Sequence, residues 1–188
     1  KRIHIVGSEQ KIEDEIEDIR SSMLLMGGMA VEMIKYSLDG LLKGAKPSIQ
    51  KTFELEEKVN LAEVEVDAMC NKFLVLRAPA AYDLRFILCT LRMIRDIERI
   101  GDEAEKMARM AQYFHEEIQS DVPKPNLALM VTDVVTMLEK VLNAYARDDD
   151  SELKKVINFD EVVDEKFRKT LNDLMSFILE KKESVGCC

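Results

Sequence analysis

The chain has 188 residues, of which 47% are hydrophobic, and its formal net charge is −9 at pH 7. A chain of this length and hydrophobic content can bury a sizeable core, which excludes a disordered polypeptide. The negative charge argues against nucleic acid as a partner, because phosphate backbones select basic surfaces. An acidic chain is better suited to cations.

Membrane and secretory signals are not found in the sequence. Its apolar windows are too short for a bilayer, and residues 3–6 lack the hydrophobic core and cleavage site of a signal peptide. Of the four cysteines, Cys70 and Cys89 lie in apolar stretches, and Cys187 and Cys188 are adjacent. This spacing fits no zinc site, so we expect reduced thiols in a soluble, cytoplasmic protein.

The secondary structure is predicted to be all-α. Seven glycines and four prolines leave few breakpoints, and β-branched residues never alternate as they do in a strand. Apolar spacing of four and three residues predicts five helices, over about residues 8–43, 48–76, 79–114, 127–147 and 153–179.

The predicted core follows the same spacing, which keeps side chains on one helix face. In the first two helices its members are Ile12, Ile16, Ile19, Met23, Met26, Ala30 and Met33, then Leu55, Val59, Ala62, Val66, Met69, Phe73 and Leu76. In the third helix, Leu84, Leu88 and Leu91 are predicted to face the core.

The apolar line of the third helix continues into the charged residues Arg95, Glu98 and Asp102. A seven-residue step drifts only about 20° around a helix, so these charges stand where the pattern calls for leucine. Glu98 and Asp102 lie one turn apart on the same side. Their carboxylates repel unless a cation, a proton or an arginine lies between them. Ion pairs with Arg95 and Arg99 are the plain alternative to a cation site.

A second acid pair, Glu63 and Asp67, flanks the core line of the second helix. Pro79 ends this helix and begins the third, so the two helices are predicted to lie antiparallel. At about 1.5 Å per residue, Glu63 and Glu98 stand at similar heights above the turn. The sequence therefore predicts one site built from four carboxylates, with ordinary surface acids as the alternative.

A polar run with two prolines, over residues 115–126, separates a second unit from the first. We predict domains over residues 1–115 and 124–188. In the last helix, Asp160 and Asp164 fall on the apolar line, 97 residues after the first acid pair. The chain thus has the pattern of a repeated three-helix bundle whose second copy is incomplete and lacks its third helix.

Two helices alone cover only part of each other's apolar face. We therefore expect an uncovered stripe in the second unit, which a further helix or a second chain would close. The predicted members of this stripe are Val134, Leu138, Phe167, Leu171 and Leu174.

Two motifs carry a family resemblance: Leu76-Arg77-x-Pro79-Ala80-x-x-Asp83-Leu84-Arg85, and then Glu98-Arg99-Ile100-Gly101-Asp102. With Val59-Asn60 upstream, they closely resemble the PhoU family of phosphate-transport accessory proteins. The whole chain follows the order of that family apart from its last helix. The resemblance implies tandem three-helix bundles whose Glu/Asp-x-x-x-Asp motifs bind multinuclear metal clusters.

By position, the resemblance assigns metal-binding carboxylates to Glu63, Asp67, Glu98, Asp102, Asp160 and Asp164. Carboxylate oxygens favour hard cations, so the expected metals are magnesium, manganese, calcium or ferric iron, with zinc less favoured.

The resemblance also implies a function without enzymatic activity. Members are negative regulators of phosphate uptake and of the phosphate-starvation response. They link the ATPase of the ABC phosphate transporter (PstB) to the sensor histidine kinase (PhoR), meet the membrane only through the transporter, and form homodimers or larger oligomers. Two alternatives stay open: a helical scaffold with salt-bridged acids, and a carboxylate-bridged di-iron enzyme, whose Glu-x-x-His motif the chain lacks.

Overall fold

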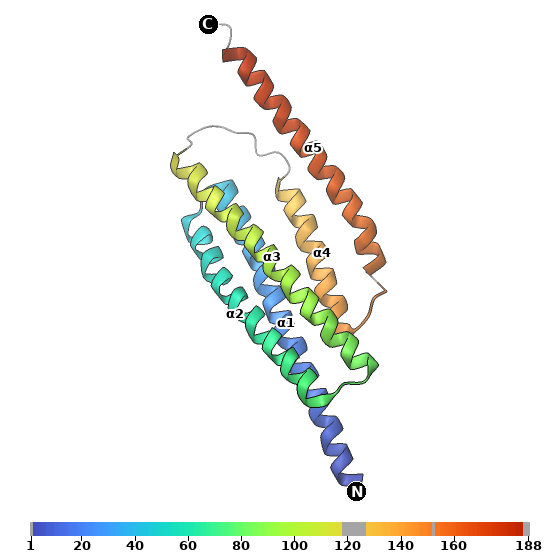
Figure 1. Cartoon of the computed structure of the whole chain (residues 1–188). Coiled ribbons are helices and arrows are strands. Elements are labelled where there is room, and N and C mark those ends of the chain that lie inside the picture. Colours follow the sequence, from blue (N-terminus) through green and yellow to red (C-terminus); the bar gives the residue numbers. More distant parts are fainter. Residues whose placement is uncertain (1, 118–126, 152, 186–188) are drawn as a thin grey trace. The chain divides into compact units, whose positions relative to one another are not determined.

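The structure is a computed structural model that describes residues 2–117, 127–151 and 153–185, with side chains described over 10–116, 127–151 and 153–172. Its helices are α1 (Arg2–Lys43), α2 (Lys46–Arg77), α3 (Ala81–Glu117), α4 (Leu127–Arg147) and α5 (Leu153–Val185) (Figure 1). Strands are absent from the described residues, and the all-α prediction is confirmed. Within the same residues, no helix combines the length and the apolarity that a bilayer crossing requires.

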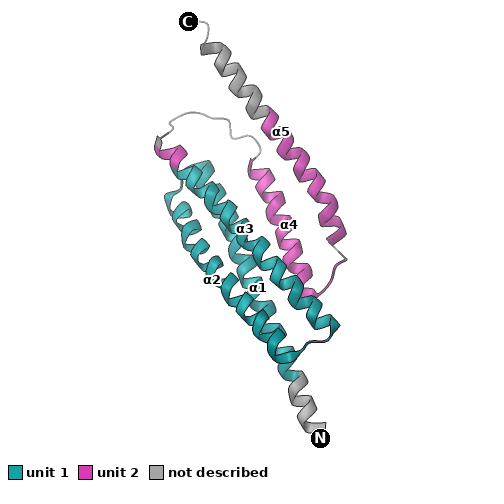
Figure 2. Ribbon diagram, viewed as in Figure 1, with its two compact units in different colours: residues 1–112 teal, residues 113–188 magenta. Residues whose placement is uncertain are grey.

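The chain divides into two compact units, residues 1–112 and 113–188 (Figure 2). The first unit contains α1, α2 and most of α3, and the second contains α4 and α5. Most of the predicted connecting run, residues 118–126, lies outside the described residues.

In the first unit, α1 and α2 present the predicted apolar lines to a common core. The buried members are Ile19, Met23, Met26, Ala30 and Met33 from α1, and Leu55, Val59, Val66 and Phe73 from α2. Unbranched methionine fills irregular gaps between helices well, which suits the α1 line. Leu76 departs from the prediction and is 60% exposed, because α2 ends at the next residue.

The predicted core face of α3 is wrong. Leu84 and Leu88 are 37% and 43% exposed, and Leu91 is only half-buried. The buried side chains are instead Ile87, Thr90, Ile94, Ile97, Ala104, Ala108 and Ala111. This second line has the same four-three spacing as the leucines, so spacing alone does not decide between the two faces.

Gly101 lies where α3 approaches both other helices of the first unit. A Cβ atom added there would stand 3.4 Å from Val59 Cγ1 on α2 and 3.5 Å from Met33 Sδ on α1. These are ordinary van der Waals distances, so a methyl group would fit there and the packing does not itself require glycine. At the end of α2, Ala78 adopts a left-handed conformation with φ of 44°, and three residues later α3 begins. This short turn makes α2 and α3 the predicted antiparallel hairpin.

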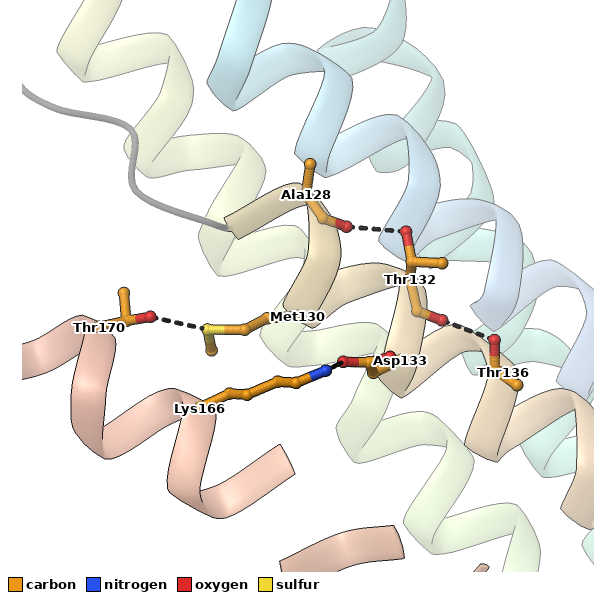
Figure 3. Close-up of polar contacts among 7 residues, drawn as sticks. All are labelled: Ala128, Met130, Thr132, Asp133, Thr136, Lys166 and Thr170. Atoms are coloured by element: carbon orange, nitrogen blue, oxygen red, sulfur yellow. Dashed lines mark hydrogen bonds and ion pairs between the residues drawn. The ribbon is translucent and has the colours of Figure 1, made fainter. Parts of the chain in front are cut away.

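In the second unit, α4 and α5 also pair antiparallel, as two cross-helix contacts show (Figure 3). Lys166 Nζ of α5 lies 2.5 Å from Asp133 Oδ2 of α4, and Thr170 Oγ1 lies 3.3 Å from Met130 Sδ. These contacts lie at corresponding distances from the connection between the helices, which sets the register of the pair.

The second unit buries a small set of its described side chains. The buried positions are Val135, Leu142 and Ala144 on α4 and Val156 and Thr170 on α5. Among the stripe residues, Val134, Phe167 and Leu171 are exposed as expected, at 39%, 55% and 48%, and Leu138 is half-buried. The side chain of Leu174 lies outside the described residues.

Candidate metal centre

Two carboxylates of α3 lie at the rim of the core in the first unit. Glu98 directly follows the buried Ile97, and Asp102 directly follows the buried Gly101. One residue corresponds to about 100° around a helix, so each acid is turned from the core to its edge. Both side chains are half-buried as a result.

The α2 side of the same rim carries Glu56, Asn60, Glu63 and Asp67, all half-buried. They flank the buried positions of α2 in the same way. Asn60 Nδ2 donates a hydrogen bond to Glu56 Oε1, which holds these two side chains together.

Glu98 shows that acids of the two helices act on one another. Burial raises the pKa of Glu98, and the negative charges of Asp102 and Glu63 raise it further. Glu56 adds to the effect, whereas the neighbouring Arg99 opposes it. The structure therefore brings Glu98 into electrostatic range of one carboxylate on its own helix and two on α2.

Asp67 has polar partners of its own on α2. Its Oδ2 atom accepts a hydrogen bond of 2.7 Å from Asn71 Nδ2. Its charge also contributes to the raised pKa of the Cys70 thiol, about 12, which is caused mainly by burial. Asp67 thus interacts with the next turn of α2, whereas Glu63 and Glu56 act on Glu98.

Glu56 and Asn60 were missed by sequence reasoning, although a signal for them exists. The stretch Glu56-Glu57-Lys58-Val59-Asn60 matches Asp160-Glu161-Val162-Val163-Asp164 in its acids, its valine and its final Asn or Asp. The two stretches are 104 residues apart. This offset equates Asp160 with Glu56 instead of Glu63 and moves the repeat by seven residues, two helical turns.

Asp160 and Asp164 lie on α5 of the second unit. Both side chains are exposed, so the prediction that they occupy core positions is wrong. The α5 positions that face α4 include Val156 and Thr170 instead.

The ion-pair alternative for Glu98 and Asp102 does not form. Arg95 and Arg99 are exposed, and in the described part of the chain neither makes a salt bridge to these acids. The acids around Glu98 are therefore left without a compensating ion pair, and their oxygen donors suit a hard cation. Among the described side chains, however, no three acids, histidines or cysteines are grouped so as to hold one metal ion. The metal assignment stays a prediction.

The chain matches the PhoU domain over residues 23–111 and 127–186. The phosphate-specific transport system accessory protein PhoU homolog of Pseudomonas aeruginosa is 31% identical over 177 residues, which are 94% of this chain and 73% of that protein. The phosphate-specific transport system accessory protein PhoU of Escherichia coli K12 is 28% identical over 97% of this chain and 74% of its own length.

Solved structures give the same result for the fold. The crystal structure of PhoU from Pseudomonas aeruginosa superposes with a TM-score of 0.86 at 31% identity and covers 93% of this chain and 83% of that one. The regulatory protein PhoU of Streptococcus pneumoniae superposes with a TM-score of 0.82 at 20% identity, over 90% and 79% of the two chains. Sequence and fold agree, and the chain belongs to the PhoU family.

Proposed function

We propose that this chain is an accessory regulator of phosphate transport that restrains phosphate uptake and the phosphate-starvation response. The observation that carries the proposal is the family match over both halves of the chain. Relatives across nearly its whole length are named accessory proteins of the phosphate-specific transport system, which favours a regulatory role over a catalytic one.

In this proposal the chain acts by protein contact on the cytoplasmic side of the membrane. It connects the ATPase of the ABC phosphate transporter to the sensor histidine kinase, and it self-associates. Five helices without a catalytic constellation in the described residues are compatible with an adaptor, whose work is done by its surfaces.

We further propose that a hard cation binds between α2 and α3, held by Glu98 and Asp102 together with Glu63 and Glu56. The support is electrostatic: carboxylates of both helices raise the pKa of Glu98, and among the described residues no arginine makes a salt bridge to Glu98 or Asp102. Mn²⁺, Mg²⁺ or ferric iron would remove this repulsion and join the two helices. The cation would thereby stabilise one arrangement of the hairpin.

Replacement of the gene by variants in its own host tests the regulatory role. Deletion should raise a phosphate-starvation reporter in phosphate-rich medium and increase the uptake of labelled phosphate. The variant Asp102→Asn should reproduce part of this effect if the cation serves regulation, whereas Glu13→Gln, at an exposed acid of α1, should not. An unchanged reporter and unchanged uptake after deletion would contradict the proposal.

A further inference from the structure

An exposed surface of α3 is left unexplained by the candidate metal centre. It consists of Leu84, Arg85, Leu88, Arg92 and Arg95, which we call the α3 outer face. At about 100° per residue these side chains fall within one sector of the helix, away from the buried line of Ile87 and Ile94. Leu84 and Arg85 belong to the motifs that carry the family resemblance.

The arginines of this face differ from others in the chain. Arg77, Arg109 and Arg168 each make a salt bridge to a glutamate. Across the described residues, Arg85, Arg92 and Arg95 make none, and all three are exposed. An acidic protein thus presents a row of unpaired guanidinium groups on one helix.

Apolar side chains lie among these arginines. Leu84 and Leu88 are 37% and 43% exposed, and at the adjoining turn Val75, Leu76 and Tyr82 are 83%, 60% and 53% exposed. Exposed apolar groups edged by charges are typical of protein interaction surfaces, where arginine is enriched and lysine depleted. The combination indicates a contact surface rather than an ordinary solvated helix face.

We propose that the α3 outer face docks a partner protein whose contact surface is apolar and edged by carboxylates. Leu84 and Leu88 would pack against its apolar part, and the guanidinium groups of Arg85, Arg92 and Arg95 would each pair with a carboxylate. Because the face lies on a long continuous helix packed against the core, little ordering is needed on binding.

Two other occupants fit less well. An anionic membrane surface or a nucleic acid presents negative charge throughout. The net charge of −9 and the exposed Asp96 beside Arg92 would repel such a surface. A second copy in a twofold contact would bring arginines opposite arginines, because both subunits use the same patch. A protein with separate acidic and apolar positions avoids both conflicts.

The proposal rests on the adaptor function proposed above, and two purified proteins serve as probes: the transporter ATPase and the cytoplasmic part of the sensor kinase. Binding of the full chain to each is measured by biolayer interferometry at low and high salt. The test variants are Leu88→Asp and the double change Arg85→Glu with Arg92→Glu. Their controls are Leu25→Asp, at a leucine that is 68% exposed on α1, and Arg147→Glu on α4.

Both test variants should weaken binding to at least one probe by about tenfold or more, whereas the controls should leave it unchanged. Wild-type binding should weaken with salt. Circular dichroism checks that the variants remain folded, as their exposed positions predict.

If both variants bind the probes as tightly as wild type does, the docking surface is overturned and the adaptor function still stands. Failure of wild type to bind either probe overturns the adaptor function, and the docking surface with it. A variant that changes only sedimentation would assign the face to a second copy. The variants are also tested for binding to phosphatidylglycerol vesicles, and a loss seen only there would assign the face to a membrane. A change in sedimentation alone or in vesicle binding alone overturns the proposal.

Discussion

Arg77 at the end of α2 donates two hydrogen bonds to Glu15 of α1. Nε lies 2.8 Å from Oε2 and Nη2 lies 2.6 Å from Oε1, across a separation of 62 residues in the sequence. Parallel bonds of this kind fix both position and angle. The pair therefore holds the last turn of α2, and with it the start of the α2–α3 hairpin, against α1.

Substitution of Arg77 by Lys should destabilise the first unit, because an ammonium group cannot reproduce the two-bond geometry. We expect a fall in melting temperature on the order of 2–4 °C at pH 7. The matched control is Glu103→Gln, which removes a salt bridge between exposed residues one turn apart on α3, Lys106 and Glu103, and should cost less than about 1 °C. Equal effects of the two substitutions would contradict the structural role of Arg77.

The same pair predicts a pH dependence. The hydrogen bonds from Arg77 lower the pKa of Glu15 below 4.5. A carboxyl group whose pKa is lower in the folded state stabilises that state above its unfolded pKa and loses this effect as pH falls through the folded pKa. The difference between wild type and Glu15→Gln should therefore be full at pH 7 and shrink below pH 4.5. Urea unfolding at several pH values measures it.

Two glycines of α1 should respond to alanine in opposite directions. Gly28 has no atom within 4 Å of an added Cβ, so Gly28→Ala should stabilise the helix by up to about 1 kcal/mol. At Gly40 the same Cβ would stand 2.6 Å from Ile49 Cγ1, which lies next to the α2 backbone. Gly40→Ala should therefore be destabilising. Denaturant unfolding of both variants under one condition tests the pair, and the same sign for both would contradict the packing of α1 on α2.

The core face of α1 could be predicted from its apolar spacing. The line through Ile19, Met23 and Met33 is buried as predicted, and Val31 and Ile34 beside it widen the buried face. In α3, the leucines and the isoleucines both had helical spacing, and the choice depended on which face met α1 and α2. That information is tertiary and is not contained in the period of one helix.

The same limit applies to the candidate site. The hairpin at Pro79 was enough to bring Glu63 toward Glu98, because a short turn fixes the heights of both helices. Acids at Glu56, Glu63 and Asp67 all lie on one side of α2, so the sequence leaves open which of them meets α3. The packed hairpin places Glu63 and Glu56 among the charges that act most on Glu98.

These interactions predict different effects of Glu56→Gln and Asp67→Asn on cation binding. Glutamine and asparagine keep the size of the acid and remove its charge, which a hard cation needs. Glu56→Gln should weaken Mn²⁺ binding by about tenfold or more, as the loss of an anionic neighbour at a metal site does. Asp67→Asn should change it by less than about threefold, because the side-chain hydrogen bond of Asp67 is to Asn71 on its own helix. Isothermal titration calorimetry measures both affinities. If Asp67→Asn has the larger effect, the result would support the repeat offset of 97 residues, which equates Asp164 with Asp67.

The last prediction concerns Glu98 itself and separates a cation site from a merely crowded group of acids. Burial and the charges of Asp102 and Glu63 raise the pKa of Glu98 above 4.5. An acid with a raised folded-state pKa binds more protons folded than unfolded, so stability falls as pH rises from 4.5 through the folded pKa.

Without metal, Glu98→Gln should therefore be more stable than wild type at pH 7, and this difference should vanish below pH 4.5. With Mn²⁺ the order should reverse, because a ligand that binds only the folded state stabilises wild type and not the variant. Melting curves in EDTA and in millimolar Mn²⁺ give both comparisons, with Glu13→Gln as an exposed control. If the melting temperature of wild type is the same in EDTA and in Mn²⁺, these carboxylates hold no such ion. Their repulsion would then destabilise the folded hairpin without a cation to offset it.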